Sequence, residues 1–137
     1  MDIGVQEVQG KVPATIMQLH GELDASNYMQ VIARARELYA AGSRRLLLDL
    51  SDLSFMASSG LVALHSIVLI MNGEEPPDLE YGWSAFRAAT EAAQGQTTAV
   101  CKVLNPRPSV NRTLEVSGFK TFLGVYTDLE TALAAFG

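Results

Sequence analysis

Two short segments hold the side chains whose types could carry chemistry. Residues 21–24 (GELD) place two carboxylates, Glu22 and Asp24, at the end of an expected strand, and residues 57–60 place two adjacent hydroxyls just before an apolar helical stretch. A carboxylate can bind a cation or a basic group of a partner, and a serine at a helix start can cap the helix or accept a phosphoryl group. The two histidines, His20 and His65, lack a nearby nucleophile pattern and are expected to be structural or solvated.

The two hydroxyls of the second segment are Ser58 and Ser59, and either is the expected N-cap of the following helix. A serine hydroxyl can accept a hydrogen bond from the otherwise unpaired amides of a first helical turn, so Ser58→Ala should cost about 0.5 to 2 kcal/mol of stability. Asp24 could cap the helix that follows it in the same way. Asp49 is expected to be a hydrogen-bonded residue at a strand end, and Asp52 a turn former.

Alternating strands and helices are expected to position these segments. Apolar side chains at a spacing of 3.6 residues predict a helix from Tyr28 to near Ala41, with Gly42 at its end. The nearly continuous apolar run 46–50 predicts a central parallel strand that is buried on both faces. In chain order, the expected elements are strands over 3–8 and 14–20, the helix from Tyr28, the strand 46–50, the helix that opens at Ser58 or Ser59, a strand over 98–104, a helix over 108–117 closed by Gly118, a strand over 122–126 and a last helix opened by a capping box at 127–130.

This order of elements predicts an α/β fold, with a mixed sheet of about five strands, crossover helices and parallel later strands. The length of 137 residues corresponds to a single domain, expected to span 1–137. Residues 73–96 interrupt the alternation with a charged, proline-containing loop and a stretch in which Trp83 and Phe86 have helical spacing. They are interpreted as a helical insertion between the second helix and the next strand.

Composition and charge argue against several classes of function. The 48% hydrophobic and 18% charged residues indicate a globular chain, and Lys+Arg 10 against Asp+Glu 15 gives a net charge of -5, which disfavours nucleic acid and anionic membranes as partners. The single cysteine, Cys101, suffices for neither an internal disulfide nor a cysteine-based zinc site, and should be a buried apolar side chain. No apolar run reaches the roughly 20 residues of a membrane helix. We therefore expect a cytoplasmic chain without a metal or cofactor.

Taken together, the two segments resemble the STAS domain of the bacterial anti-sigma factor antagonists. In that family a strand ends in G-E-L-D, as residues 21–24 do. A later strand runs through D-L-S-x-(L/V)-x-F-(hydrophobic)-D-S-(S/T)-G into a helix, as residues 49–60 do with one exception. Residues 105–119 also resemble a segment of the family that follows a strand. The resemblance covers nearly the whole chain apart from 73–96 and implies a STAS-type fold.

The resemblance implies a regulatory interaction module that is not an enzyme. STAS antagonists bind an anti-sigma factor that has a serine-kinase domain, which frees a sigma factor, and that kinase phosphorylates the serine that opens the helix. Ser58 matches this serine, with Ser59 as the second choice, and a phosphatase could reverse the modification. The expected partner surface comprises Glu22, Asp24, Ser58, Ser59 and Gly60, because neighbouring parallel strands end at the same edge of a sheet.

Two alternatives stay open. The sequence departs from the family pattern at Ala57, where the family usually has an aspartate. This departure favours a STAS scaffold or sensor that is not phosphorylated and binds a ligand or a protein subunit. A further interpretation gathers Glu22, Asp24, Asp49 and Asp52 at the strand ends as a magnesium site like that of a phospho-accepting receiver domain. The paired acidic residues and the late lysine of a receiver are not found at the required positions, so the interaction module is the leading interpretation.

Overall fold

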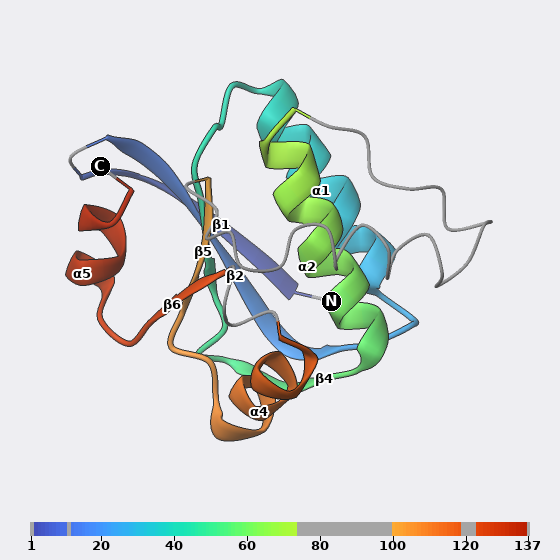
Figure 1. The fold of residues 1–137 in the computed structure, drawn as a ribbon. Coiled ribbons are helices and arrows are strands. Elements are labelled where there is room, and N and C mark those ends of the chain that lie inside the picture. The colour runs from blue at the N-terminus through green and yellow to red at the C-terminus, as the bar shows by residue number, and fades with distance from the viewer. Residues whose placement is uncertain (1, 11, 74–99, 119–122, 137) are drawn as a thin grey trace.

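The computed structural model describes residues 2–10, 12–73, 100–118 and 123–136. The insertion expected over 73–96 lies outside these residues except for its first one, as do the starts of the strands expected over 98–104 and 122–126. In chain order, the elements are β1 (Asp2–Gln9), β2 (Pro13–Leu23), α1 (Tyr28–Ala40), β3 (Leu46–Asp49), β4 (Leu53–Met56), α2 (Ser58–Met71), β5 (Cys101–Leu104), α4 (Pro108–Ser117), β6 (Gly124–Tyr126) and α5 (Leu129–Ala134). Helices α1 and α2 cover one face of the sheet, and α5 lies on the other (Figure 1).

The strands form one mixed sheet in the order β1-β2-β3-β5-β6, with β4 paired to β2 beside this path. β1 and β2 form the expected antiparallel hairpin, and the pairs β2-β3, β3-β5 and β5-β6 are all parallel. The expected α/β fold, with a mixed sheet, parallel later strands and crossover helices, is therefore confirmed. The sheet has one strand more than the sequence predicts.

That additional strand is β4, which continues the pairing of β2. It runs parallel to the end of β2, beyond the last residue of β3. Burial does not alternate along β4, because Leu53 and Met56 are buried whereas Ser54 and Phe55 between them are exposed. A strand of four residues without alternation gives no periodic signal, so the sequence predicts only a loop at this place.

β3 is the central strand and is buried on both faces, as its apolar run predicts. Leu46 and Leu48 face the cluster beneath α1 and α2, whereas Leu47 faces the smaller cluster beneath α5. The main cluster also includes side chains from β2, both covering helices and β5, among them Met17, Leu19, Val31, Leu64, Ile67 and Val103. The sheet is therefore held between two apolar layers, and its exposed edges and ends are left to carry polar chemistry.

β5 carries one charged side chain into the core. Lys102 is 4% exposed, and its Nζ lies 5.7 Å from the centre of the Tyr126 ring and 5.5 Å from that of Phe136. Burial lowers the pKa of Lys102, because its charged form loses hydration. Cys101 beside it is buried, as expected, and burial raises the pKa of its thiol to about 12. This thiol is an inert part of the core.

Glycine ends α1 where the sequence predicts it. Gly42 has a φ of 112°, and its N–H donates to the carbonyl of Tyr39 at 3.0 Å. The N–H of Ser43 donates to the carbonyl of Leu38, also at 3.0 Å. These two bonds form a Schellman motif, which requires the left-handed conformation that glycine adopts without strain. The carbonyls of Leu38 and Tyr39 at the end of α1 thus have hydrogen-bond donors within the chain.

The start of α5 differs in detail from the expected capping box. Asp128, and not Thr127, is the N-cap, and its carboxylate accepts hydrogen bonds from the N–H of Thr131 at 2.9 Å and from its hydroxyl at 2.8 Å. These two bonds lower the pKa of Asp128. The prediction was wrong by one residue, because the backbone enters the helix only after Asp128, whose carboxylate then faces the free amides.

A glycine lets the start of α2 approach the strands. A Cβ built on Gly60 would lie 2.5 Å from Cγ of Met56 and 3.1 Å from Cγ of Leu23. We predict that Gly60→Ala lowers the free energy of unfolding by about 1 to 3 kcal/mol, the usual cost of overpacking, although alanine favours a helix by about 1 kcal/mol over glycine. Urea denaturation checks this prediction. A stabilised variant would show that α2 does not approach β2 and β4 so closely.

Candidate functional site

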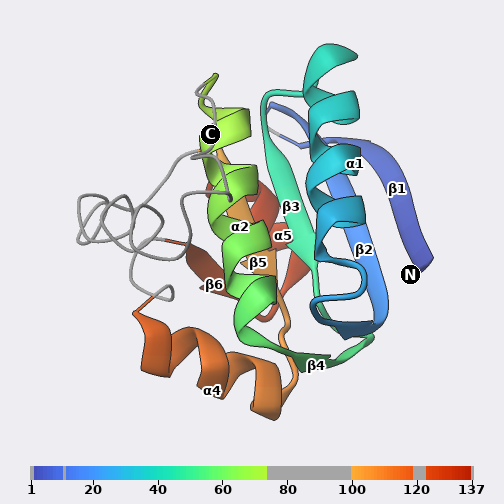
Figure 2. The same ribbon diagram turned by 90° about the vertical axis from the view of Figure 1, so that its right-hand side faces the viewer.

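The ends of β2 and β4 and the start of α2 meet at one edge of the sheet (Figure 2). Glu22 and Leu23 of β2 pair with Phe55 and Met56 of β4. The N–H of Ala57, which follows β4, donates to the carbonyl of Leu23 at 2.9 Å. The two segments that the sequence singles out therefore lie side by side, as predicted.

An irregularity in β2 bends the strand just before this edge. The pairing between β2 and β4 shifts register between Gly21 and Glu22, and Gly21 has a φ of 97°. Such a backbone conformation favours glycine, which explains the first letter of the GELD segment. The hydroxyl of Ser54 donates to the carbonyl of Gly21 at 3.0 Å, and that of Ser109 in α4 donates to the carbonyl of Ser54 at 3.2 Å. These bonds connect β2, β4 and α4.

Asp24 organises the turn between β2 and α1. Its carboxylate accepts hydrogen bonds from the N–H and the hydroxyl of Ser26, at 2.9 and 2.5 Å, and these bonds lower the pKa of Asp24. Asn27 is the N-cap residue of α1, and its side chain bonds the N–H of Asp24 and the carbonyl of Glu22. The hypothesis that Asp24 caps α1 is therefore wrong, because its carboxylate is used inside the preceding turn. It is half-buried there.

The two serines at the start of α2 differ in their exposure to solvent. The N-cap residue is Ala57, and no side chain accepts a hydrogen bond at this end. The prediction that Ser58 or Ser59 caps α2 is therefore wrong, because they are the first and second residues inside the helix, one and two positions past the N-cap. Ser58 is exposed. The Oγ atom of Ser59 is buried and has no hydrogen-bond partner among the described residues.

The expected partner residues thus differ in their access to solvent. Glu22 and Ser58 are exposed, whereas Gly60 is buried against Met56 and Leu23. Sequence reasoning missed one exposed residue at this place. Phe55, opposite Glu22, is 48% exposed, although an aromatic residue in a strand is expected to face the core. No signal in the sequence shows this exposure, because it depends on the unrecognised strand β4.

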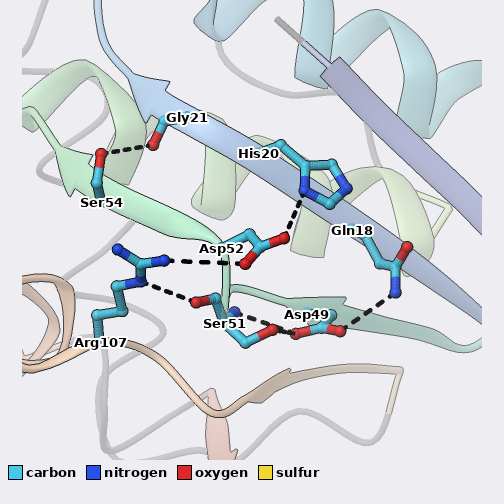
Figure 3. A network of polar contacts seen from close by, with 8 residues as sticks. All are labelled: Gln18, His20, Gly21, Asp49, Ser51, Asp52, Ser54 and Arg107. Carbon is cyan, nitrogen blue, oxygen red and sulfur yellow. Dashed lines mark hydrogen bonds and ion pairs between the residues drawn. The ribbon is translucent and has the colours of Figure 1, made fainter.

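A polar network holds the connection between β3 and β4 in place (Figure 3). Asp49, at the end of β3, accepts hydrogen bonds from the hydroxyl of Ser51 at 2.7 Å and from the side-chain amide of Gln18 at 3.4 Å, which confirms its expected role. Asp52 bonds Nδ1 of His20 at 2.9 Å. It also lies 3.8 Å from a guanidinium nitrogen of Arg107. The acidic residues of this connection are therefore occupied by structural partners.

The described residues hold no cluster of three or more histidine, cysteine, aspartate or glutamate side chains that could bind a metal ion. The four carboxylates of the magnesium interpretation belong to separate arrangements: Glu22 is exposed on β2, Asp24 belongs to its own turn, and Asp49 and Asp52 belong to the network at the β3-β4 connection. The gathering of acids that this interpretation requires is not present in this part of the chain.

Comparison with known proteins identifies the family. The family model of the STAS domain matches residues 5–72, which contain the GELD turn, β4 and all of α2. The chain contains a STAS domain. No curated protein matches the chain at a significant level. Among the helices of the described residues, none is long and apolar enough to cross a membrane.

Solved structures share the fold of this STAS domain. A putative anti-sigma factor antagonist from Thermotoga maritima is 15% identical, with a TM-score of 0.67, over 96% of this chain and 92% of that one. An anti-sigma factor antagonist from Mycobacterium paratuberculosis is 18% identical, with a TM-score of 0.61, over 98% and 94%. The anti-sigma factor antagonist SpoIIAA in its unphosphorylated form is 18% identical, with a TM-score of 0.51, over 97% and 94%.

The missing cap bonds change what serine substitutions should do to stability. We predict that Ser58→Ala changes the free energy of unfolding by less than about 0.5 kcal/mol, since an exposed hydroxyl without a partner contributes little. Ser59→Ala should be neutral or stabilise the domain by up to about 1 kcal/mol, because it removes a buried hydroxyl that lacks a partner. Thermal and urea denaturation measure both changes.

The matched control for these variants is Asp128→Ala, which removes a cap that the structure does show. It should lower the melting temperature more than either serine substitution. A loss on Ser58→Ala as large as that of the control would show that the Ser58 hydroxyl caps α2 after all.

Proposed function

We propose that this STAS domain is an anti-sigma factor antagonist. In this proposal it docks on an anti-sigma factor of the serine-kinase type through the docking surface formed by Glu22, Asp24, Phe55 and Ser58, and phosphorylation of Ser58 controls the docking. The observation that carries the proposal is the exposed Ser58 hydroxyl at the start of α2, beside an exposed aromatic ring and next to the GELD turn. Its fold relative SpoIIAA is known in a phosphorylated form, which supports control of this chain by phosphorylation.

The difference between the two serines supports Ser58 over Ser59 as the modified residue. A kinase must bring the hydroxyl oxygen into line with the γ-phosphate of ATP, so the oxygen has to be accessible. Ser58 meets this condition, whereas Oγ of Ser59 is buried. Ser59 could react only if the first turn of α2 opened, and Gly60 packs that turn against β2 and β4.

A phosphate on Ser58 should act on docking and leave the fold intact. It would add about -1.5 to -2 charges at a helix start, where the free amides and the helix dipole favour an anion. No other charged residue occurs in α2, and the nearest acidic residues of the docking surface, Glu22 and Asp24, precede α1. The added charge would therefore meet the partner directly, at the place where the interface otherwise takes the Ser58 hydroxyl.

Ala57 adjusts this switch without removing it. The family usually has an aspartate here, which could orient the serine hydroxyl or a basic group of the partner. With Ala57 in place of this aspartate, the side chains of the kinase must orient Ser58. A phosphate on Ser58 is then also free of the repulsion that a neighbouring carboxylate would cause. The alternative function, a STAS scaffold or sensor that is not phosphorylated and binds a ligand or a protein subunit, is favoured by this same residue.

In this role the chain acts as a single-domain binding module without catalytic activity of its own, and a phosphatase that removes the phosphate from Ser58 would reset it. Because its partner controls bacterial transcription, the proposal places the chain in the cytoplasm. Gly60 takes part by positioning α2 rather than by touching the partner, since it is buried.

We predict that Ser58→Asp weakens binding to the serine-kinase-type anti-sigma factor of the source organism by about tenfold or more, because it inserts an uncompensated charge into the interface. Ser58→Ala should bind like the parent and take up no phosphate. Ser59→Ala is the matched control and should still be phosphorylated. Calorimetry measures binding, and mass spectrometry of peptides from the kinase reaction locates the phosphate.

Two results would separate the alternatives. Phosphate found on Ser59 would move the switch by one residue and contradict the argument from burial. Binding of Ser58→Asp at parental strength, or no binding to any anti-sigma factor, would exclude the switch and leave the scaffold or sensor function.

A further prediction concerns Phe55, whose ring the structure exposes. Phe55→Ala should weaken binding to the anti-sigma factor by about tenfold, as expected for an aromatic anchor in an interface, and should change stability little because the ring is half-exposed. Val116→Ala in α4 is the control, since Val116 is 81% exposed and lies outside the docking surface. Equal effects of the two substitutions on calorimetric affinity would show that Phe55 does not touch the partner.

A further inference from the structure

A pocket lies at the end of the sheet opposite the docking surface. It has a volume of about 320 Å³ and is formed between the end of the β1-β2 hairpin and the connection 41–45 from α1 to β3. The lining includes Thr15 near the start of β2, whereas the docking surface begins at Glu22 near the end of that strand. At about 3.3 Å per residue, these positions are separated by roughly 23 Å. The pocket is therefore a second site, independent of the proposed docking.

The walls of the pocket are already fixed by interactions within the chain. The guanidinium of Arg44 stacks 3.9 Å from the centre of the Tyr39 ring, and its Nη1 donates to the carbonyls of Tyr39 and Ser43. The N–H of Thr15 donates to the carbonyl of Arg45 at 3.0 Å. The connection from α1 to β3 is thus tied to α1 on one side and to β2 on the other, and the Schellman motif at Gly42 closes the helix end itself. A ligand would find these groups in place.

The polar groups of the pocket are mostly hydrogen-bond donors. Arg45 is half-buried, and its guanidinium has no hydrogen bond or ion pair with the described residues. The hydroxyls of Thr15 and Ser43 are 2.7 Å apart and share one hydrogen bond, so one hydroxyl hydrogen remains to be donated. Among the lining residues, the only carboxylate is that of Glu7, which is exposed.

We propose that this pocket binds a small organic oxyanion, a carboxylate or a phosphate monoester, through the guanidinium of Arg45. Arginine presents a planar fork of donors that matches two oxygens of such a group, and the guanidinium donors of Arg45 are not used by any acceptor among the described residues. Arg44 adds a second positive charge, and the remaining hydroxyl hydrogen of the Thr15 and Ser43 pair adds a donor. The volume suits a small molecule rather than a polymer.

Two substitutions with opposite expected effects on the binding affinity test the proposal. Succinate, glycerol phosphate and inorganic phosphate are titrated separately into the full chain, and amide chemical shifts are followed by NMR. Saturable shifts are expected at 13–15 and 42–45, and whether succinate or the phosphates bind more tightly identifies the source of the oxyanion. Arg45→Gln should weaken binding by about tenfold or more, the loss expected for a charged hydrogen bond. Glu7→Gln should strengthen it several-fold, because it removes a like charge at the rim.

Arg112→Gln is the matched control, because it removes one arginine charge from exposed α4, away from the pocket. It should leave binding unchanged. If Arg45→Gln fails to fold by circular dichroism, Arg45→Lys, which keeps the charge but loses the fork, should bind several-fold more weakly than the parent. The proposal is overturned if none of the three probes gives saturable shifts, if the shifts lie elsewhere, or if Arg45→Gln and Arg112→Gln have equal effects.

Discussion

The contact between the start of α2 and the ends of β2 and β4 is the constraint on which the candidate site depends. Because Gly60 has no side chain, the first turn of the helix lies directly against Met56 and Leu23. This approach sets the rotation of the turn, so that Ser58 is exposed while Oγ of Ser59 is buried. One glycine in the core therefore decides which of two adjacent hydroxyls an enzyme can reach.

Much of the fold could be predicted from the sequence, because its signals are local. The hairpin, the end of α1 at Gly42 and the doubly buried strand β3 follow from turn residues and apolar periodicity. β4 could not be predicted, since it exists only because β2 continues past the end of β3 and offers a pairing edge. The predicted N-caps were wrong for a related reason: the residue that begins a helix is set by where the chain leaves the preceding element, and this path depends on tertiary packing.

The site was predictable in outline and not in detail. The order of elements places the GELD turn beside the start of α2, but exposure is a property of packing, and it divides the expected residues into exposed Glu22 and Ser58 and buried Gly60. The exposed ring of Phe55 contradicts the usual position of an aromatic residue in a strand. At the other end of the sheet, the pocket is lined by residues of the hairpin and by residues of the α1-β3 connection. No local sequence pattern predicts that these two segments lie side by side.

In the proposed function, a partner docks at the edge where β2, β4 and α2 meet. Hydrogen–deuterium exchange of the chain, alone and with a serine-kinase-type anti-sigma factor, measures where this docking occurs. We expect slower exchange in the complex at residues 22–26 and 55–60, with β1 and α5 unchanged, because only the first two segments border the docking surface. Protection confined to β1 or α5, with no change at 22–26 and 55–60, would contradict it.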